Sequence, residues 1–320
     1  MALILRPARW WTLFKRALAG WWNDNVPRLG ASLAYYTLFA IAPILLVAIA
    51  IAGLVFGPEA VRGEITGQIR GMVGEAGART VQGMLEGASR RESGILATAI
   101  GVVTFILTST GAFLELQTAL NNIWRVKPKE NVNLQSFLVD RLKGFALVVG
   151  VGFLLLVSLV VSAGLAALGK YIGGLLPGWV ALLQVLNVLV SFGVITLLFA
   201  MVYKVLPDVR LQWRHVWVGA ATTAGLFTLG KFLIGLYLGT TSTTSTYGAA
   251  GSVIVVLLWV YYASQIVLLG AEFTRVYTES TGELVATQQH ATTAPEVAKD
   301  ASQTDPAATG ADVGPVVDGG

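Results

Sequence analysis

Residues 247–277 read YGAAGSVIVVLLWVYYASQIVLLGAEFTRVY, and this stretch decides the fold class of the chain. Its part from residue 253 to residue 271 carries no Asp, Glu, Lys or Arg. A helix of about 20 such residues, rising ~1.5 Å per residue, crosses the ~30 Å hydrocarbon core of a bilayer. Hydrophobic residues make up 55% of the 320 residues and charged residues only 12%, well below the roughly one quarter typical of soluble domains. The sequence therefore predicts an all-α, polytopic membrane protein.

Five further stretches have the same apolar character, so we expect six transmembrane helices. The expected spans lie at about 31–56, 94–117, 144–169, 179–203, 216–239 and 248–277. Lys and Arg gather before the first span and in the second and fourth loops, whereas the third loop has only Lys170 and the fifth has none. Because cytoplasmic loops are enriched in Lys and Arg, both termini are expected to be cytoplasmic. The first loop does not discriminate between the two possible orientations in the membrane, since it holds as many Glu as Arg residues.

The segments outside the spans have patterns of their own. Residues 1–30 are expected to form a cytoplasmic segment with an interfacial amphipathic helix. The apolar face of that helix is expected to hold Trp10, Phe14, Leu18, Trp21 and Trp22, opposite Lys15 and Arg16. The outer loop 57–93 has apolar residues at helical spacing interrupted by glycines, which predicts two short helices, acting as a packing cap or as a lid. The spans form a domain over 31–278, and residues 279–320, without aromatic residues, are expected to be a disordered cytoplasmic tail.

Lys231 is the unusual residue of the fifth span, because it lies ~12 Å inside the outer end. An ammonium group at that depth needs a partner or water. The sequence leaves three readings open: Lys231 snorkels to the headgroups as an anchor, holds an anion such as a lipid phosphate in a polar cavity, or serves helix packing. Uncharged polar residues are expected at the same depth. The candidate binding residues are Lys231, Gln184, Asn187, Ser191, Thr228 and Ser252.

Two other features accompany these residues. Glycines in the fifth span predict close backbone approach around the lysine; they are Gly225, Gly230, Gly235 and Gly239. A second polar cluster is expected at the cytoplasmic ends of the helices. Its members are Glu115, Arg141, Asp208, Arg214, Glu272 and Arg275. Structural ion pairs are the expected role of this network, and a gate or proton relay is the alternative.

Several strings together are similar to the YihY/BrkB family of bacterial inner-membrane proteins. They are LGASLAYYTLFAIAPILL at 29–46, LNNIWRV at 120–126, KVLPDVRLQWRHVWVGA at 204–220, GKFLIGLYLG at 230–239 and the stretch at 247–277. The resemblance covers roughly residues 10–278. It implies a six-span plasma-membrane protein, with older ideas of a ribonuclease (ribonuclease BN) and of a virulence factor, and a suspected role in lipid or envelope handling. It supplies no agreed catalytic residues.

Enzymatic chemistry finds little support in the residues. Metal-dependent RNA hydrolysis requires clustered His, Asp or Glu ligands, and the chain has only His215 and His290 and no cysteine. A phosphate-binding loop motif is also absent. We therefore expect no metal, no cofactor, no enzymatic activity and no nucleic-acid partner, and we attribute the net charge of +4 to topology signals.

These observations lead to one functional expectation and one alternative. We expect a multi-pass bacterial plasma-membrane protein that transports or binds an anionic lipid or lipid-linked amphiphile in envelope maintenance. The alternative is a structural or assembly membrane protein that transports nothing. Membrane lipids are the expected partners, with homo-oligomeric or envelope-protein contacts left open.

Overall fold

The computed structural model describes residues 7–89, 111–128, 177–240, 243–281, 286–287 and 291–293, with single helical positions at 144, 150, 154, 161 and 164. Most of the second expected span and nearly all of the third lie outside the described residues. The described part of the chain is helical apart from four short strands. The expectation of an all-α membrane protein is therefore confirmed.

The first three helices follow one another with tight connections. Helix α1 (Pro7–Asn23) meets α2 (Val26–Phe56) through a turn at Asn25, whose φ of 52° is a left-handed conformation that Asn tolerates. Helix α2 ends at Gly57, with φ 82°, and α3 (Pro58–Ser89) begins immediately on a proline. Helix α2 contains the whole of the first expected span.

Helix α3 is bent into two limbs at Gly74. Gly74 has a φ of 75° and a ψ of −179°, a backbone conformation that glycine adopts readily and that is strained for other residues. The limbs are residues 58–73 and 75–89. They bury apolar side chains, among them Val61, Val81 and Leu85, against α2 and the last long helix. The two limbs match the pair of helices expected for the first loop.

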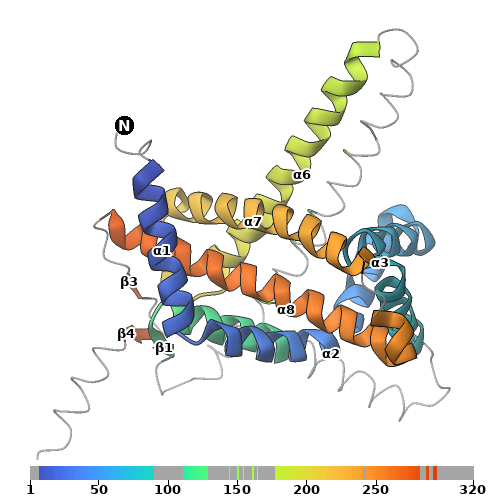
Figure 1. Ribbon diagram of the computed structural model, residues 1–320, viewed down its shortest axis with the longest axis horizontal. Coiled ribbons are helices and arrows are strands. Elements are labelled where there is room, and N and C mark those ends of the chain that lie inside the picture. Colours follow the sequence, from blue (N-terminus) through green and yellow to red (C-terminus); the bar gives the residue numbers. More distant parts are fainter. Residues whose placement is uncertain are drawn as a thin grey trace, which may run out of the picture.

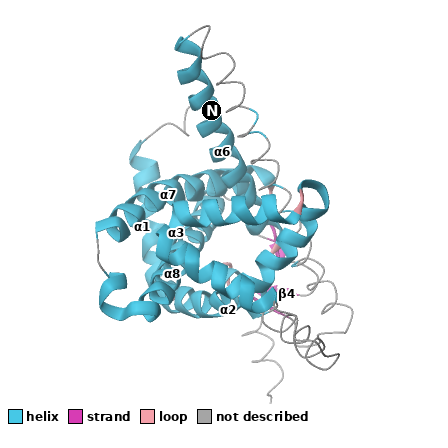
Figure 2. Ribbon diagram, turned by 90° about the vertical axis from the view of Figure 1, so that its right-hand side faces the viewer, coloured by secondary structure: helices cyan, strands magenta, loops and turns pink. Residues whose placement is uncertain are grey.

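Three later helices are long and apolar enough to cross a membrane. They are α6 (Pro177–Val205), α7 (Trp213–Thr240) and α8 (Thr243–Ser280). The membrane-compatible parts are Leu182–Val205, Trp213–Ile234 and Val253–Ser280. Helices α7 and α8 lie side by side, with α2 along α8, whereas the first half of α6 projects from the body in both views (Figures 1 and 2). These helices correspond to the last three expected spans.

Helices α7 and α8 approach closely through reciprocal glycine and threonine pairs. Gly219 of α7 lies under Thr274 of α8, and Gly270 of α8 lies under Thr223 of α7, so a methyl group added at either glycine would overlap the facing hydroxyl. Each threonine hydroxyl donates to the carbonyl of the glycine four residues earlier on its own helix, at 2.8 and 2.7 Å. The Tyr203 hydroxyl of α6 lies 3.0 Å from that of Thr223. Small residues at this interface let the backbones meet.

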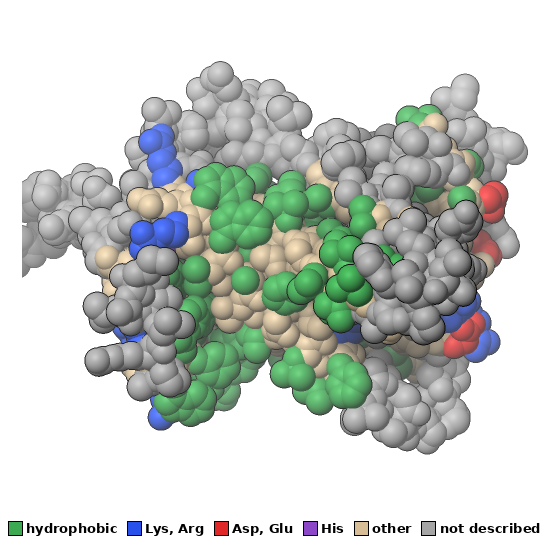
Figure 3. Space-filling view, turned by 90° about the horizontal axis from the view of Figure 1, so that it is seen from above, with side chains coloured by type: hydrophobic (Ala, Val, Ile, Leu, Met, Phe, Trp, Pro, Cys, Tyr) green, Lys and Arg blue, Asp and Glu red, His purple; other side chains and the backbone are tan. Residues whose placement is uncertain are grey.

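The described helices form a body with two chemically distinct ends. The α1 end comprises α1, the first turn of α2, residues 120–126, the last turns of α6 and α8, and the start of α7 (Figure 1). The α3 end comprises the two limbs of α3 with the parts of α2 and α8 that they cover. An apolar band separates charged side chains at the two ends (Figure 3). Such a band between charged ends is what a bilayer requires.

Helix α1 lies across the body at the α1 end. Its Leu13 and Ala17 are buried against Phe273 and Val276 of α8, and Trp10 stacks on the same surface. The other side of α1 leaves large side chains exposed; they are Trp11, Leu18 and Trp22. The expected apolar face is therefore divided, because one part packs on α8 and the other remains on the surface.

Two antiparallel strand pairs close the α1 end. Strand β1 (Val126–Pro128) pairs with β4 (Ala291–Thr293), and β2 (Val209–Arg210) pairs with β3 (Ala286–Thr287). The segment expected to be a disordered tail begins at residue 279, but helix α8 continues to Ser280 and strands β3 and β4 lie in the same segment. The prediction of disorder is therefore wrong for these residues. Pairing with loop backbone gives these residues hydrogen-bond partners that composition alone does not reveal. The tail after residue 293 lies outside the described residues.

Candidate functional site

Lys231 lies on an exposed, apolar face of α7. Its side chain is exposed, and so is that of Thr228 one turn earlier. The neighbouring Leu229, Phe232 and Leu233 are 57%, 69% and 53% exposed. In a membrane protein such a face contacts acyl chains, so the amine of Lys231 leaves the helix into a lipid environment.

Two exposed tryptophans define the depth of Lys231. Trp213 and Trp217 lie at the start of α7 and are 50% and 43% exposed, and exposed tryptophans are enriched at the membrane–water interface. From Trp217 to Lys231 the helix rises ~21 Å at ~1.5 Å per residue. Since the hydrocarbon core is ~30 Å thick, Lys231 lies roughly two thirds of the way across it, within about 10 Å of the boundary nearer the α3 end.

The polar residues expected beside Lys231 lie mainly on α6. Gln184 is exposed, and Asn187 and Ser191 are half-buried. They lie in the first half of α6, which also exposes Leu182, Val185, Val188 and Leu189. The side chain of Ser252 lies outside the described residues. A common binding site formed by these six residues stays a prediction.

A buried ion network at the α1 end contains two of the expected cytoplasmic residues. The Arg275 guanidinium donates to the Glu272 carboxylate at 2.7 Å and to Glu279 at 2.7 Å, and it lies 3.7 Å from Asp24. The side chains of Glu272 and Arg275 are 0% and 8% exposed. The carboxylates come from α8 and from the turn after α1, so the network joins those two parts of the chain.

Gly20 allows this contact between α1 and α8. A Cβ at this position would lie 2.6 Å from a Glu272 carboxylate oxygen and 3.0 Å from an Arg275 nitrogen. A second contact is made about two turns earlier along α8, where the Trp21 indole donates to Gln265 at 3.1 Å. Helix α1 is thus held by a close backbone approach and by hydrogen bonds in addition to its apolar contacts.

Asp208 belongs to a separate polar cluster. Its backbone N–H donates to the Asn121 side-chain oxygen at 2.9 Å, and the Asn121 amide donates back to the Asp208 carboxylate at 2.9 Å. Gln117 donates to the same carboxylate at 3.3 Å. This arrangement fixes the loop between α6 and α7 on the helical segment 111–123.

Two further members of the expected network, Glu115 and Arg214, are not joined to these clusters within the described residues. Glu115 is half-buried and Arg214 is exposed, and neither forms an ion pair within the described residues. Arg141 lies outside them. Among the described residues no group of three or more His, Asp or Glu side chains could hold a metal ion.

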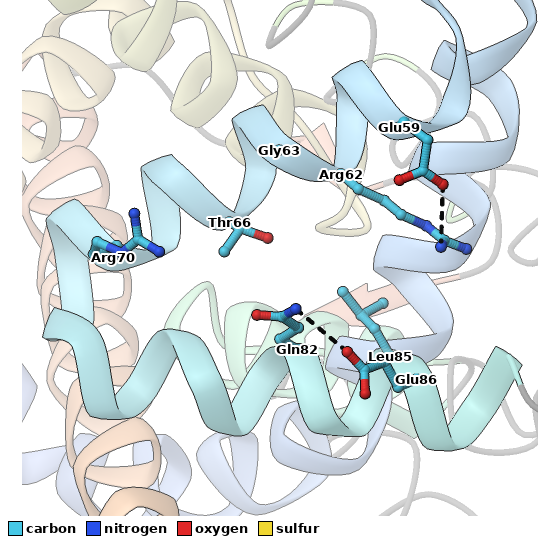
Figure 4. Close-up of a pocket in the computed structure, with 8 residues that line it drawn as sticks. All are labelled: Glu59, Arg62, Gly63, Thr66, Arg70, Gln82, Leu85 and Glu86. Atoms are coloured by element: carbon cyan, nitrogen blue, oxygen red, sulfur yellow. Dashed lines mark hydrogen bonds and ion pairs between the residues drawn. The ribbon is translucent and has the colours of Figure 1, made fainter.

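The two limbs of α3 enclose a polar groove of about 570 Å³ (Figure 4). Its lining residues are Glu59, Arg62, Gly63, Thr66, Arg70, Gln82, Leu85 and Glu86. Glu59 and Arg62 form an ion pair of 3.7 Å, and the Gln82 amide donates to Glu86 at 3.3 Å. Sequence reasoning treated this loop as a cap or lid and did not identify the groove. The spacing of Glu59, Arg62, Thr66 and Arg70 on one helical face is the signal that could have indicated it.

The chain is similar to bacterial proteins that carry the same name, UPF0761 membrane protein. The chain is 32% identical to a UPF0761 membrane protein of Azotobacter vinelandii over 82% of its own length and 61% of the relative's. It is 30% identical to a UPF0761 membrane protein of Albidiferax ferrireducens over 78% of its length and 58% of the relative's. The chain thus spans about six tenths of the length of these relatives.

No solved structure matches the chain. The relatives are bacterial and are named membrane proteins, which agrees with the apolar helices of the fold and supports a bacterial membrane location. The model of one family matches residues 17–295, which include α2, α3, α6, α7 and α8 in full. The chain therefore belongs to the virulence factor BrkB family.

Proposed function

We propose that this protein is a non-enzymatic, six-span protein of the bacterial plasma membrane that binds, and moves, an anionic lipid or lipid-linked amphiphile in envelope maintenance. Both termini are cytoplasmic in this proposal. The described residues at the α1 end support that orientation, since basic side chains there come from several separate segments. They are Lys15, Arg16, Arg28, Arg125, Lys204, Arg210 and Arg214. The three arginines of α3, by contrast, are accompanied by four glutamates.

The position of Lys231 is the observation that carries the proposal. Its neighbours Leu229, Phe232 and Leu233 are exposed apolar side chains, so among the described residues of this face no charged group compensates the ammonium. A lysine at this depth costs about 2.5–3.5 kcal/mol on insertion scales. Its flexible stem lets the amine reach the headgroups of the nearer leaflet. A lipid phosphate there offsets part of the cost, and it makes Lys231 a preferred contact for an anionic headgroup.

Lipid retention tests this proposal. The full chain is extracted in mild detergent and its bound lipids are identified by native mass spectrometry. Lys231→Met keeps the length and apolar character of the stem without the charge, and it is expected to lower anionic-lipid occupancy about tenfold, which corresponds to ~1.4 kcal/mol. Lys231→Arg is expected to retain the lipid. Arg79→Met, at a side chain 73% exposed on α3, serves as the control for loss of one positive charge.

Equal anionic-lipid occupancy in Lys231→Met and in the unaltered protein would refute the proposal. The alternative function, a structural or assembly protein, is favoured by the dense packing of the α1 end, where Leu120, Ile123, Tyr203 and Leu268 are fully buried. In that case Lys231→Met leaves both lipid occupancy and the envelope phenotype intact.

A further inference from the structure

The groove on α3 shares no lining residue with the face that carries Lys231, so its chemistry is separate from the proposed function. Its volume of about 570 Å³ is typical of a small-ligand site. The first limb contributes Glu59, Arg62, Thr66 and Arg70 to one side, and the second limb faces them (Figure 4). The apolar stripes of both limbs are directed toward α2 and α8, which leaves the polar sides to form the groove.

Glu59 and Arg62 offer two opposite charges at one end of the groove (Figure 4). Their ion pair is long, at 3.7 Å, and the two side chains are 87% and 47% exposed. Exposed pairs of this kind contribute only ~0–1 kcal/mol. They therefore separate readily when a ligand supplies a better partner for each charge.

A ligand with one charge satisfies only half of this pair. An anion bound by Arg62 leaves the Glu59 carboxylate beside a like charge, and a cation bound by Glu59 leaves the guanidinium unpaired. A ligand carrying both a phosphate and an ammonium group satisfies both, because an arginine fork matches phosphate oxygens and a carboxylate accepts from an ammonium. Thr66 and Gln82 supply uncharged polar groups between the limbs.

The location of the groove indicates where such a ligand comes from. The charges of α3 form one end of the molecule, beyond the apolar band (Figure 3). Groups at that level of a membrane protein meet lipid headgroups and the adjoining water. We propose that the α3 groove binds a phosphoethanolamine group, with its phosphate on Arg62 and its ammonium on Glu59.

Glycine positions on α3 provide a matched test. A Cβ at either Gly63 or Gly67 would meet nothing within 4 Å, but only Gly63 lines the groove, so a longer side chain at Gly63 is expected to project into it. Gly63→Leu is therefore expected to block the groove, and Gly67→Leu is the control on the same limb. Both replacements favour helix over glycine, and circular dichroism verifies that both variants are folded.

Binding is measured on the full chain with two probes, soluble glycerophosphoethanolamine and phosphatidylethanolamine in nanodiscs, with phosphatidylglycerol as the anion-only comparison. In the Lys231→Met background, which removes the lipid contact of the proposed function, Gly63→Leu and Arg62→Gln are expected to weaken phosphatidylethanolamine binding at least tenfold, while Gly67→Leu leaves it unchanged. Glu59→Gln is expected to weaken phosphatidylethanolamine binding without weakening that of phosphatidylglycerol. Because every variant compared here lacks the Lys231 ammonium, the result is independent of the proposal that rests on Lys231.

The two probes distinguish the sources of the ligand. Binding of both probes indicates a site open to soluble phosphoethanolamine compounds, and binding of the lipid alone indicates a headgroup presented by the membrane; each outcome supports the proposed chemistry. Equal phosphatidylethanolamine binding by Gly63→Leu and Gly67→Leu would overturn it. So would, in the Lys231→Met background, binding of phosphatidylglycerol as tight as that of phosphatidylethanolamine.

Discussion

Removal of Arg275 is expected to destabilise the α1 end more than removal of other charges. The Arg275 side chain is 8% exposed and holds the fully buried Glu272 carboxylate at 2.7 Å. It also binds Glu279 at 2.7 Å and approaches Asp24 at 3.7 Å. Arg275→Met fills a similar space with an apolar side chain. The change therefore leaves Glu272 buried without its cationic partner.

The magnitude follows from the burial of this pair. Breaking a buried ion pair by removing one partner typically costs ~3–5 kcal/mol, whereas replacing both partners is often nearly neutral. Glu279 is 42% exposed and pairs with Arg16, itself 54% exposed, at 3.5 Å, so its own loss is small. We expect Arg275→Met to cost about 3 kcal/mol, or roughly 6–12 °C in Tm. The double variant with Glu272→Gln is expected to recover about 2 kcal/mol of that loss.

Thermal unfolding of the detergent-solubilised full chain, followed by tryptophan fluorescence, measures these differences as a double-mutant cycle. Arg16→Met is the matched control, because it removes a cation from the same network at an exposed position. The reasoning is refuted when Arg275→Met lowers Tm no more than Arg16→Met. It is equally refuted when the losses of Arg275→Met and Glu272→Gln simply add.

Two further predictions concern helix packing. Trp10→Ala removes a half-buried ring stacked 5.9 Å from Phe273, so it is expected to cost about 2–3 kcal/mol, below the ~3–5 kcal/mol of a fully buried tryptophan, and to expose α1 to limited proteolysis. Trp11→Ala, at a ring 60% exposed, is expected to do neither. Gly270→Ala places a methyl group against the α7 threonine and is expected to cost about 1–3 kcal/mol in thermal unfolding. Gly225→Ala, where a Cβ meets nothing within 4 Å, is expected to leave Tm unchanged or raise it.

The long elements could be predicted from the sequence because lipid imposes a simple rule on them. The length of the apolar stretches alone predicts where α6, α7 and α8 begin and end, with errors of a few residues. This is possible because a spanning helix must satisfy every backbone group internally. The two limbs of α3 follow equally from an apolar stripe interrupted by glycine. Periodicity and length were sufficient in these cases because the signal is local.

Contacts between helices were harder to predict, because they depend on rotation about each helix axis. The glycine series of α7 indicated close approach at Gly230, where a Cβ would overlap Tyr262 of α8, and at Gly225, where the structure has open space. The series did not include the reciprocal contacts made by Gly219 and Gly270. The division of the α1 surface between α8 and the exterior depends in the same way on docking. The α3 groove also requires two limbs to face each other, which one helical pattern cannot show.

The separation of the α1 and α3 ends allows binding and assembly roles to be distinguished by one combination of variants. Arg275 belongs to the ion network at the α1 end and Gly63 to the groove at the α3 end, and the core clusters at the two ends share no residue. Distant sites without common partners are additive to within ~0.3–0.5 kcal/mol. In a static scaffold, Gly63→Leu combined with Arg275→Met therefore has the stability of Arg275→Met and the lipid binding of Gly63→Leu. A transporter that alternates between two states must couple its two ends, so Arg275→Met would then change phosphatidylethanolamine affinity without touching the groove.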